Sequence, residues 1–387
     1  MIFDNNIFVL LALSVAFLIS FAATPMVISL AHKINAIDVP KDARRIHKKP
    51  TPLIGGLAIF YGFIVSVLCF ATLDRETTGI LIGCVIIVTV GVIDDITDMK
   101  AIIKLMCQIL AAAIVVYSGV RIEHFANPLS AWVGPPYIVL NFWVSVALTI
   151  FWIVGVCNAV NLIDGLDGLA VGVSSIASLC MLAMTLITNS PNVAILTAAV
   201  AGAGFGFLPY NFNPAKIFMG DTGALFLGFI LSCISVQGFL KLSAIISFAI
   251  PLLVLGLPIF DTMFAIFRRV MTGRSPMSPD RGHLHHRLLD MGFSQKQTVA
   301  ILYTLTAVLC LTAVVISVKG YLRGVFLIIA VMVIILASLR LMSGLRDPSR
   351  HTDYYGDYKK EENTDYTSMT ENTQNAEKKG ESDNEQN

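Results

Sequence analysis

The sequence predicts an all-α, polytopic integral membrane protein with about 11 transmembrane helices. Hydrophobic residues make up 56% of the 387 positions and charged residues only 14%, whereas a soluble chain carries roughly a quarter charged residues. Mean hydropathy is +0.75. Apolar runs of about twenty residues recur along most of the chain, and each is long enough to span a bilayer.

The apolar runs define the predicted spans. They lie at about 7–31, 52–72, 78–93, 101–120, 137–157, 168–188, 193–209, 222–240, 244–267, 298–318 and 324–342. Together they form a transmembrane domain at 1–343. The segment 344–387 is rich in Asn, Glu, Lys and Asp. It cannot bury enough apolar surface to fold, so we predict a disordered cytoplasmic tail.

The distribution of Lys and Arg sets the orientation. The segments 32–51 and 268–297, together with Lys100, Lys104 and Lys216, carry fifteen of these residues, whereas the loops on the opposite side carry five. We therefore expect the fifteen-residue side to be cytoplasmic. An odd number of spans then places the N-terminus outside and the C-terminus in the cytoplasm.

Several protein classes are excluded by the composition. No long basic block pairs with aromatic residues, so nucleic acid is not expected as a partner. All seven cysteines lie in or beside apolar runs without CxxC spacing, which excludes a disulfide framework and a zinc site. The N-terminus has no Lys or Arg before Lys33, which argues against a cleaved signal peptide.

Unusual polar segments interrupt the apolar pattern, and all fall on the predicted cytoplasmic face. They are Arg44–Gly56, Gly91–Lys100, Asn158–Ala170, Tyr210–Gly228 and Ser275–Gly292. Each alone could be a polar connector. Their shared side favours a common site, because acids at the end of an apolar segment are costly unless they face a polar cavity, a partner or a metal.

The third segment, NAVNLIDGLDGLA, is the centre of the predicted site. Asn161, Asp164 and Asp167 recur every three residues, so a helical turn would place them along one face. Asp221, in MGDTG, begins the eighth span. It could cap that helix, but Mg²⁺ typically takes one or two carboxylates with water and phosphate oxygens, and we favour that role for Asp221.

The remaining acids and a lysine fit around such an ion. Asp94 and Asp95 are adjacent carboxylates that repel each other unless one is protonated or both meet a cation. Lys104 could meet an anionic group, or it could simply extend its ammonium to the interface.

The fifth segment carries Arg281 with His283, His285 and His286. No cysteine lies nearby and the neighbouring cations oppose a divalent ion, so a surface for a diphosphate fits better than zinc. Acids for a cation and cations for phosphate, beside a membrane, predict phosphoryl transfer between a lipid phosphate and a soluble diphosphate. A transporter, with acids near the midplane, and a lipid-diphosphate phosphatase are the alternatives.

Four motifs in order, GVIDD, NAVNLIDGLDGLA, FNPAKIFMGDTGAL and SPDRGHLHHRLL, resemble the polyprenyl-phosphate N-acetylhexosamine-1-phosphate transferases. The HxHH form preceded by SPDR resembles the branch that uses UDP-GlcNAc, including the enzymes that start wall teichoic acid synthesis. The branch that uses UDP-MurNAc-pentapeptide typically has three consecutive histidines, and here Leu284 interrupts them.

The resemblance implies transfer of GlcNAc-1-phosphate from UDP-GlcNAc to undecaprenyl phosphate, with release of UMP. It implies Mg²⁺ (or Mn²⁺), a homodimer and a multi-pass plasma-membrane protein with a cytoplasmic active site. The same chemistry with UDP-MurNAc-pentapeptide or another UDP-N-acetylhexosamine remains open.

The resemblance also assigns roles to residues of this sequence. Asp221 matches the metal-binding Asp, with Asn161 nearby in its shell, and Asp94 and Asp95 match the catalytic aspartate pair. Lys104 matches a lysine that contacts phosphate. The other matched substrate-binding positions are Asp164, Asp167, Asn211, Arg281, His283, His285 and His286.

Overall fold

The structure is a computed structural model that describes residues 2–39, 50–126, 137–240, 249–273 and 282–319. The predicted span 324–342, the predicted tail 344–387 and Arg281 lie outside the described residues. The helices are α1 (Ile2–Lys33), α2 (Gly56–Phe70), α3 (Arg75–Thr97), α4 (Ala101–Ser118), α5 (Phe142–Leu162), α6 (Leu169–Ile187), α7 (Pro191–Asn211), α8 (Gly220–Ser235), the π-helix η1 (Val236–Leu240), α9 (Ala249–Val254), α10 (Gly256–Met271), α11 (Leu284–Asp290) and α12 (Gln295–Lys319).

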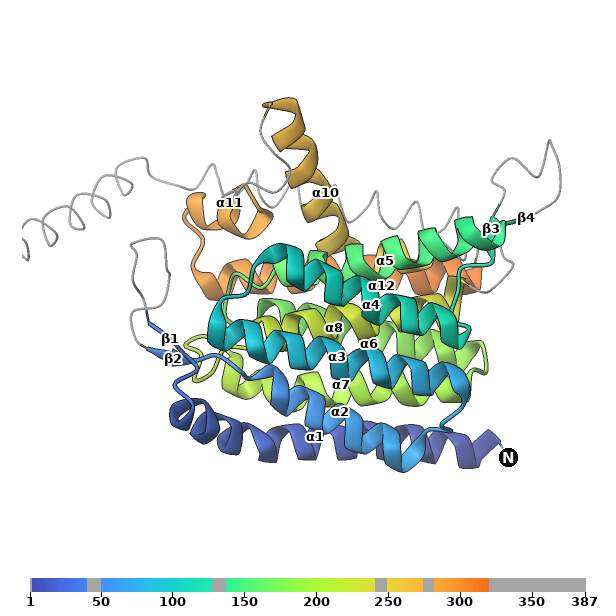
Figure 1. Cartoon of the computed structure of the whole chain (residues 1–387), viewed down its shortest axis with the longest axis horizontal. Helices are drawn as coiled ribbons and strands as arrows, with labels where there is room; N and C mark the ends of the chain where they lie inside the picture. Colours follow the sequence, from blue (N-terminus) through green and yellow to red (C-terminus); the bar gives the residue numbers. More distant parts are fainter. Residues whose placement is uncertain (1, 40–49, 127–136, 241–248, 274–281, 320–387) are drawn as a thin grey trace, which may run out of the picture. The chain divides into compact units, whose positions relative to one another are not determined.

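Within the described residues, eight helices are long and apolar enough to cross a membrane. They are α1, α3, α4, α5, α6, α7, α8 continued into η1, and α12. Figure 1 shows them running side by side. The predicted polytopic helical membrane protein is therefore confirmed. The total of eleven spans and the sidedness of the termini stay predictions.

Two of the predicted spans differ in the structure. The predicted span 52–72 is the fifteen-residue helix α2. The described part of 244–267 is divided at Leu255 into α9 and α10, and α10 stands at a steep angle to the bundle (Figure 1). Pro258 has no N–H to donate to the carbonyl of Val254, so one continuous helix could not keep its hydrogen bonds there.

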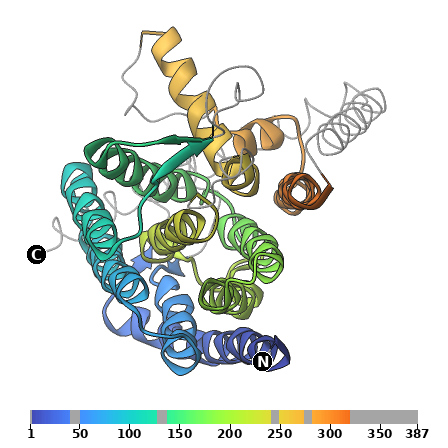
Figure 2. The same cartoon turned by 90° about the vertical axis from the view of Figure 1, so that its right-hand side faces the viewer.

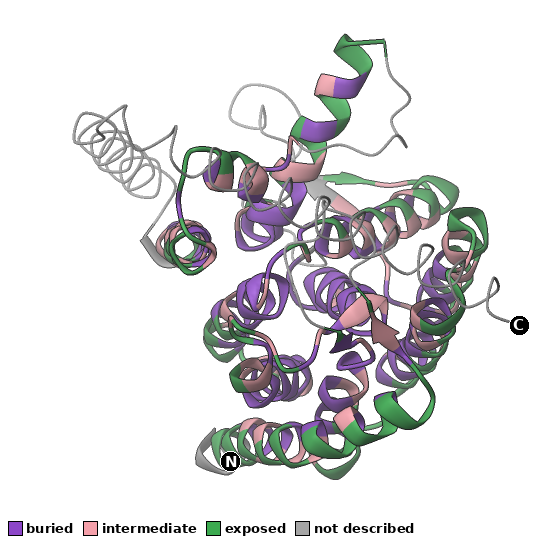
Figure 3. Ribbon diagram, turned by 90° about the vertical axis from the view of Figure 1, so that its left-hand side faces the viewer, coloured by how far each residue is buried: buried purple, intermediate pink, exposed green. Residues whose placement is uncertain are grey.

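Helix α8 lies at the centre of the bundle, as the end-on view in Figure 2 shows. Residues Thr222–Ser235 are all buried, because α8 is apolar on every face and can pack on all sides. Figure 3 shows buried residues of the surrounding helices facing inward. Gly228 allows a close approach, because a Cβ atom there would stand 2.7 Å from the Cα atom of Cys157 on α5.

A two-stranded antiparallel hairpin joins α1 to α2. Its strands are β1 (Ile37–Asp38) and β2 (Thr51–Pro52). A second hairpin, between α4 and α5, pairs β3 (His124–Ala126) with β4 (Tyr137–Val139).

The first hairpin is attached to the loop that precedes α8. The amide of Phe218 donates to the carbonyl of Pro52 at 2.8 Å, and the amide of Gly56 donates to the carbonyl of Met219 at 2.8 Å. These hydrogen bonds hold the β1–β2 hairpin and the start of α2 beside the start of α8.

Candidate active site

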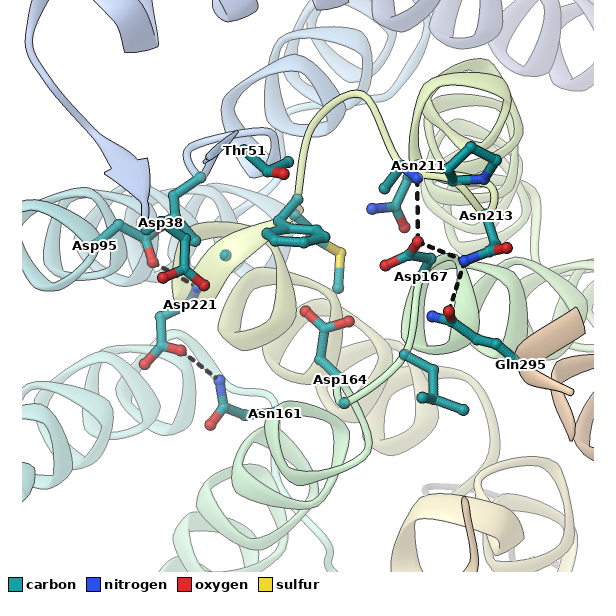
Figure 4. A pocket seen from close by; sticks show the side chains of 18 of the residues that line it. Asp38, Thr51, Asp95, Asn161, Asp164, Asp167, Asn211, Asn213, Asp221 and Gln295 are labelled. Atoms are coloured by element: carbon teal, nitrogen blue, oxygen red, sulfur yellow. Dashed lines mark hydrogen bonds between the residues drawn. The ribbon is translucent and has the colours of Figure 1, made fainter. Parts of the chain in front are cut away.

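A cavity of about 650 Å³ opens at the end of the bundle where α8 begins (Figure 4). Each of the five polar segments contributes to its lining. The lining residues from these segments include Thr51, Asp95, Asn161, Asp164, Asp167, Asn211, Asn213, Asp221 and His286. The structure therefore brings together side chains that are far apart in the sequence.

Asp95 caps the central helix. Its Oδ1 accepts a hydrogen bond from the amide of Asp221 at 2.8 Å. Its Oδ2 accepts from the amide and the hydroxyl of Thr222, at 3.1 and 2.6 Å. Helix α8 has Met219 at its N-cap and no side-chain cap of its own, so a carboxylate from α3 stabilises its first amides. Asp95, and not Asp221, performs the capping role that the sequence left open.

Lys104 links two of the acids. Its Nζ lies 2.7 Å from Oδ2 of Asp94 and 3.0 Å from Oδ2 of Asp221. Asp94 also accepts from the amide of Met99 at 2.7 Å. The sequence left two alternatives for this lysine. In the structure its ammonium group contacts anionic groups, as the first alternative predicted. Asp94 and Lys104 lie just behind the side chains that line the cavity.

Asp221 and Asn161 meet at the edge of the cavity, where Nδ2 of Asn161 donates to Oδ1 of Asp221 at 3.1 Å (Figure 4). No cluster of three or more His, Cys, Asp or Glu side chains suited to a metal occurs in the described part of the chain. One carboxylate with one carboxamide oxygen instead fits a Mg²⁺-type ion, which completes its shell with water and substrate phosphate oxygens.

Asp164 points into the cavity from the connection between α5 and α6 (Figure 4). Its carboxylate has no hydrogen-bond partner among the described residues. Burial, together with repulsion from the nearby Asp221, Asp95 and Asp167, raises the pKa of Asp164 to about 8. The protonated form of this carboxyl group therefore predominates at neutral pH, and a bound cation would favour its ionised form.

Asp167 and Asn211 join the two loops that form the cavity floor. Oδ1 of Asn211 accepts from the amide of Gly168 at 3.0 Å, while its Nδ2 donates to the carbonyl of Ile217 at 2.9 Å. Oδ2 of Asp167 accepts from Nδ2 of Asn213 at 2.9 Å. Helix α5 ends at Leu162, so Asp164 and Asp167 lie in a connection, not on the helical turn that their spacing indicated.

The three histidines occupy different environments around the short helix α11. His286 lines the cavity. His285 is buried, and burial, aided by His286, lowers its pKa to about 4, so its ring is neutral. Nδ1 of His283 lies 2.8 Å from Oδ2 of Asp261 on α10. Of the three, His286 alone lines the cavity in the described structure.

Sequence reasoning missed several residues at the cavity. Asp38 lies on β1, immediately before the basic segment, and Figure 4 shows it beside Asp95 and Asp221. Gln295, the first residue of α12, hydrogen-bonds Asn213. An acid next to the basic run was an available signal for Asp38, whereas nothing in the local sequence distinguishes Gln295.

Residues 77–239 match the model of the family described as Glycosyl transferase family 4. This range contains the acids from Asp94 to Asp221 and ends before the histidine segment. The chain is 36% identical to a probable undecaprenyl-phosphate N-acetylglucosaminyl 1-phosphate transferase of Bacillus subtilis, over 89% of this chain and 95% of the relative.

Two further relatives differ in the names of their activities. A decaprenyl-phosphate N-acetylglucosaminephosphotransferase of Mycobacterium leprae is 33% identical, over 74% of this chain and 78% of the relative. A phospho-N-acetylmuramoyl-pentapeptide-transferase of Desulforudis audaxviator is 32% identical, over 78% of this chain and 96% of the relative.

Proposed function

Because the chain belongs to glycosyl transferase family 4, we propose that it transfers N-acetylglucosamine 1-phosphate from UDP-GlcNAc to undecaprenyl phosphate and releases UMP. The observation that carries this proposal is the convergence of five polar segments on one cavity, with Asp221 and Asn161 at its edge and Lys104 just behind them, in contact with Asp221. Such a site has acids to hold a cation and a cation to hold phosphate.

In the proposed reaction, an oxygen of the lipid phosphate forms a bond to the phosphorus that carries the sugar. The bond between that phosphorus and the bridging oxygen breaks, and UMP leaves with the bridging oxygen. A phosphate monoester has a second pKa of about 6, so the attacking group is mostly dianionic at neutral pH. Catalysis then depends on positioning and charge neutralisation more than on a base.

Mg²⁺ (or Mn²⁺) is the proposed cofactor, with Asp221 and Asn161 as its protein ligands. When bound, it would neutralise charge on the diphosphate. In this proposal Lys104 contacts a phosphate oxygen of the bound substrate. Its ion pairs with Asp94 and Asp221 support that role, because they hold a cation beside the cavity. We propose that Asp94 and Asp95 orient Lys104 and α8, and that neither acts as the general base.

The donor occupies the other side of the cavity in this proposal. Asp164, Asp167, Asn211 and His286 line the cavity, and Arg281, outside the described residues, stays a predicted donor contact. The HxHH form and the names of two of the relatives favour UDP-GlcNAc, whereas the Desulforudis relative keeps UDP-MurNAc-pentapeptide as the second candidate.

We also propose a place in the cell for this activity. The chain is expected to lie in the plasma membrane, as a homodimer, with the cavity facing the cytoplasm where UDP-sugars are found. Its product would begin a cell-envelope polymer, and the linkage unit of wall teichoic acid is our first choice because of the similarity to the Bacillus relative.

A UMP-release assay on purified full-length protein tests the proposal. We expect UMP only when UDP-GlcNAc, undecaprenyl phosphate and Mg²⁺ are all present. Asp221→Asn should abolish release while the protein still elutes as one species in detergent. Asp98→Asn, which changes an exposed carboxylate of the segment Gly91–Lys100, should keep activity.

Other outcomes would refute the proposal in identifiable ways. Preference for UDP-MurNAc-pentapeptide would move the chain to the other branch. Phosphate release from a lipid diphosphate without any UDP-sugar would indicate a phosphatase, and sugar uptake into proteoliposomes without UMP would indicate a transporter. Full activity of Asp221→Asn would remove Asp221 from the metal site.

A further inference from the structure

Asp261 is a buried carboxylate outside the cavity lining, and the proposed chemistry gives it no role. It lies on α10 and belongs to none of the polar segments or motifs identified in the sequence. Its Oδ2 lies 2.8 Å from Nδ1 of His283, and its Oδ1 accepts from the amide of Leu284 at 2.8 Å. The two ionisable side chains are each only 7% exposed. Both oxygens of this carboxylate therefore contact the first residues of the histidine helix α11.

Helix α11 needs such an external anchor. It has seven residues, which is too short to be stable in isolation. His283 is its N-cap residue, and the His283 side chain makes no capping hydrogen bond. Asp261 supplies the missing acceptor from another helix, and a carboxylate is favourable beside the first amides of a helix.

Two further contacts join α10 to the region of α11, but they are weaker anchors. Nη1 of Arg268 donates to the carbonyl of Gly282 at 3.0 Å. The guanidinium groups of Arg268 and Arg287 lie 5.6 and 5.5 Å from the ring centre of Phe264, which is half exposed. Exposed cation–π contacts contribute less than buried hydrogen bonds to a charged group. Asp261 makes two such hydrogen bonds to the start of α11, whereas Arg268 reaches the backbone of Gly282, before the helix.

The position of α11 determines where two other histidines lie. His285 packs directly on Gly165, where a Cβ atom would stand 2.5 Å from the imidazole Nε2. Its ring stacks on that of His283 with centres 5.8 Å apart, and lies 4.3 Å from that of His286. His286 then reaches the cavity. A shift at His283 would thus move the side chain that lines the cavity.

We propose that Asp261 is a positioning residue: by holding His283 and capping Leu284, it fixes α11 so that His286 faces the cavity. In this arrangement His283 is a structural link between α10 and α11. The expected kinetic effect rests on the proposed function, whereas the effect on α11 itself rests on the fold alone.

Two substitutions separate positioning from proton transfer. In Asp261→Asn, the amide oxygen can still accept from Leu284, and the amide nitrogen can donate to Nδ1 of His283 in its other tautomer. That variant keeps both contacts but removes the charge and reverses the hydrogen bond to His283. Asp261→Ala removes both contacts. A positioning role predicts that only the alanine variant is impaired.

The experiment uses full-length protein in detergent. Hydrogen–deuterium exchange of a peptide covering 283–293 should increase in Asp261→Ala and stay near wild type in Asp261→Asn. The KM for UDP-GlcNAc should rise about tenfold in Asp261→Ala. That is the effect expected if the displaced His286 loses one hydrogen bond to the charged diphosphate. Its kcat should change much less, because an interaction lost equally from the bound substrate and the transition state affects KM and not kcat. Asp290→Ala, an exposed acid on the same helix, should leave both readouts unchanged.

The inference is overturned if exchange at 283–293 is unchanged in Asp261→Ala. It is also overturned if Asp261→Asn is as impaired in kinetics as Asp261→Ala without any change in exchange, because the proton would then matter and not the position. If Asp261→Ala does not elute as one species, His283→Ala can be used instead, because it removes one of the two contacts. The same exchange measurement on His283→Ala then tests the inference. The exchange measurement needs no substrate, so its outcome is independent of the proposed function.

Discussion

Replacing Asp95 with asparagine tests whether the second acid of the pair is a helix cap or a base. The carboxylate accepts three hydrogen bonds from the start of α8, two of them from Thr222. Asparagine has one oxygen. When that oxygen faces Thr222, the amide nitrogen faces the N–H of Asp221, and two donors oppose each other.

The magnitude follows from these contacts. One lost hydrogen bond to a charged group costs about 1.5–3 kcal/mol, and loss of negative charge at a helix N-terminus adds about 0.3–1 kcal/mol. Removal of the charge also relieves repulsion with nearby Asp221, which offsets part of this. We expect a net destabilisation of about 2 kcal/mol, or a decrease in Tm of about 2.5 °C for a chain of 387 residues.

Activity should fall together with stability. The amide of Asp221 is held by Asp95, and a displacement of about 1 Å at a catalytic group can cost about 10²-fold in rate. We therefore expect UMP release to decrease by about that factor at every pH from 6 to 8.5. Asp98→Asn is the matched control: Asp98 is exposed and has a φ of 53°, which asparagine also tolerates.

Thermal unfolding in detergent and pH-dependent UMP release provide the two measurements. The capping explanation is refuted if Asp95→Asn keeps the wild-type Tm and recovers activity at pH 8.5. That combination would mean that the carboxylate acts as a base, whose role a more ionised substrate can replace at high pH.

Two further predictions concern the contact between α11 and the connection from α5 to α6. In Gly165→Ala, the new Cβ atom would lie 2.5 Å from Nε2 of His285, so α11 must move and UMP release should fall about 10²-fold. Gly155→Ala, where nothing lies within 4 Å of the added atom, should be neutral, and equal activity of the two variants would contradict the contact. The second prediction is a loss of stability at acid pH. The pKa of His285 is lowered to about 4 in the folded protein and is about 6.5 when unfolded, so the unfolded state binds more protons between these values. Stability should therefore fall by about 2 kcal/mol between pH 7 and pH 5. The difference in Tm between these pH values should shrink in His285→Asn, and an undiminished difference would contradict the buried neutral ring.

The sequence predicted the helical membrane fold because its signals are local. A span of apolar residues can be recognised without reference to the rest of the chain, and each of the eight long helices of the described residues overlaps one predicted run. The break at Leu255 also had a local signal, since Pro251 and Pro258 both lie in the predicted span. Hydropathy alone does not predict this break in the helix.

The candidate site was predictable in membership but not in arrangement. Polar residues in an apolar chain are conspicuous, so Asn161, Asp164 and Asp221 were identified by type and all line the cavity. Their partners could not be inferred. Asp95 caps a helix whose first residues follow it by about 126 positions, and Asp261 became visible only through its contact with His283.

By itself, the sequence determined which segments are apolar enough to cross a bilayer and which side chains are too polar to lie there without a purpose. Both follow from the cost of placing polar groups in hydrocarbon, which each segment carries independently. Only the tertiary structure decided which carboxylate caps α8, which acid faces the cavity without a partner, and which histidine reaches it. Those outcomes depend on hydrogen bonds between separate segments, whose geometry exists only after the helices have packed around α8.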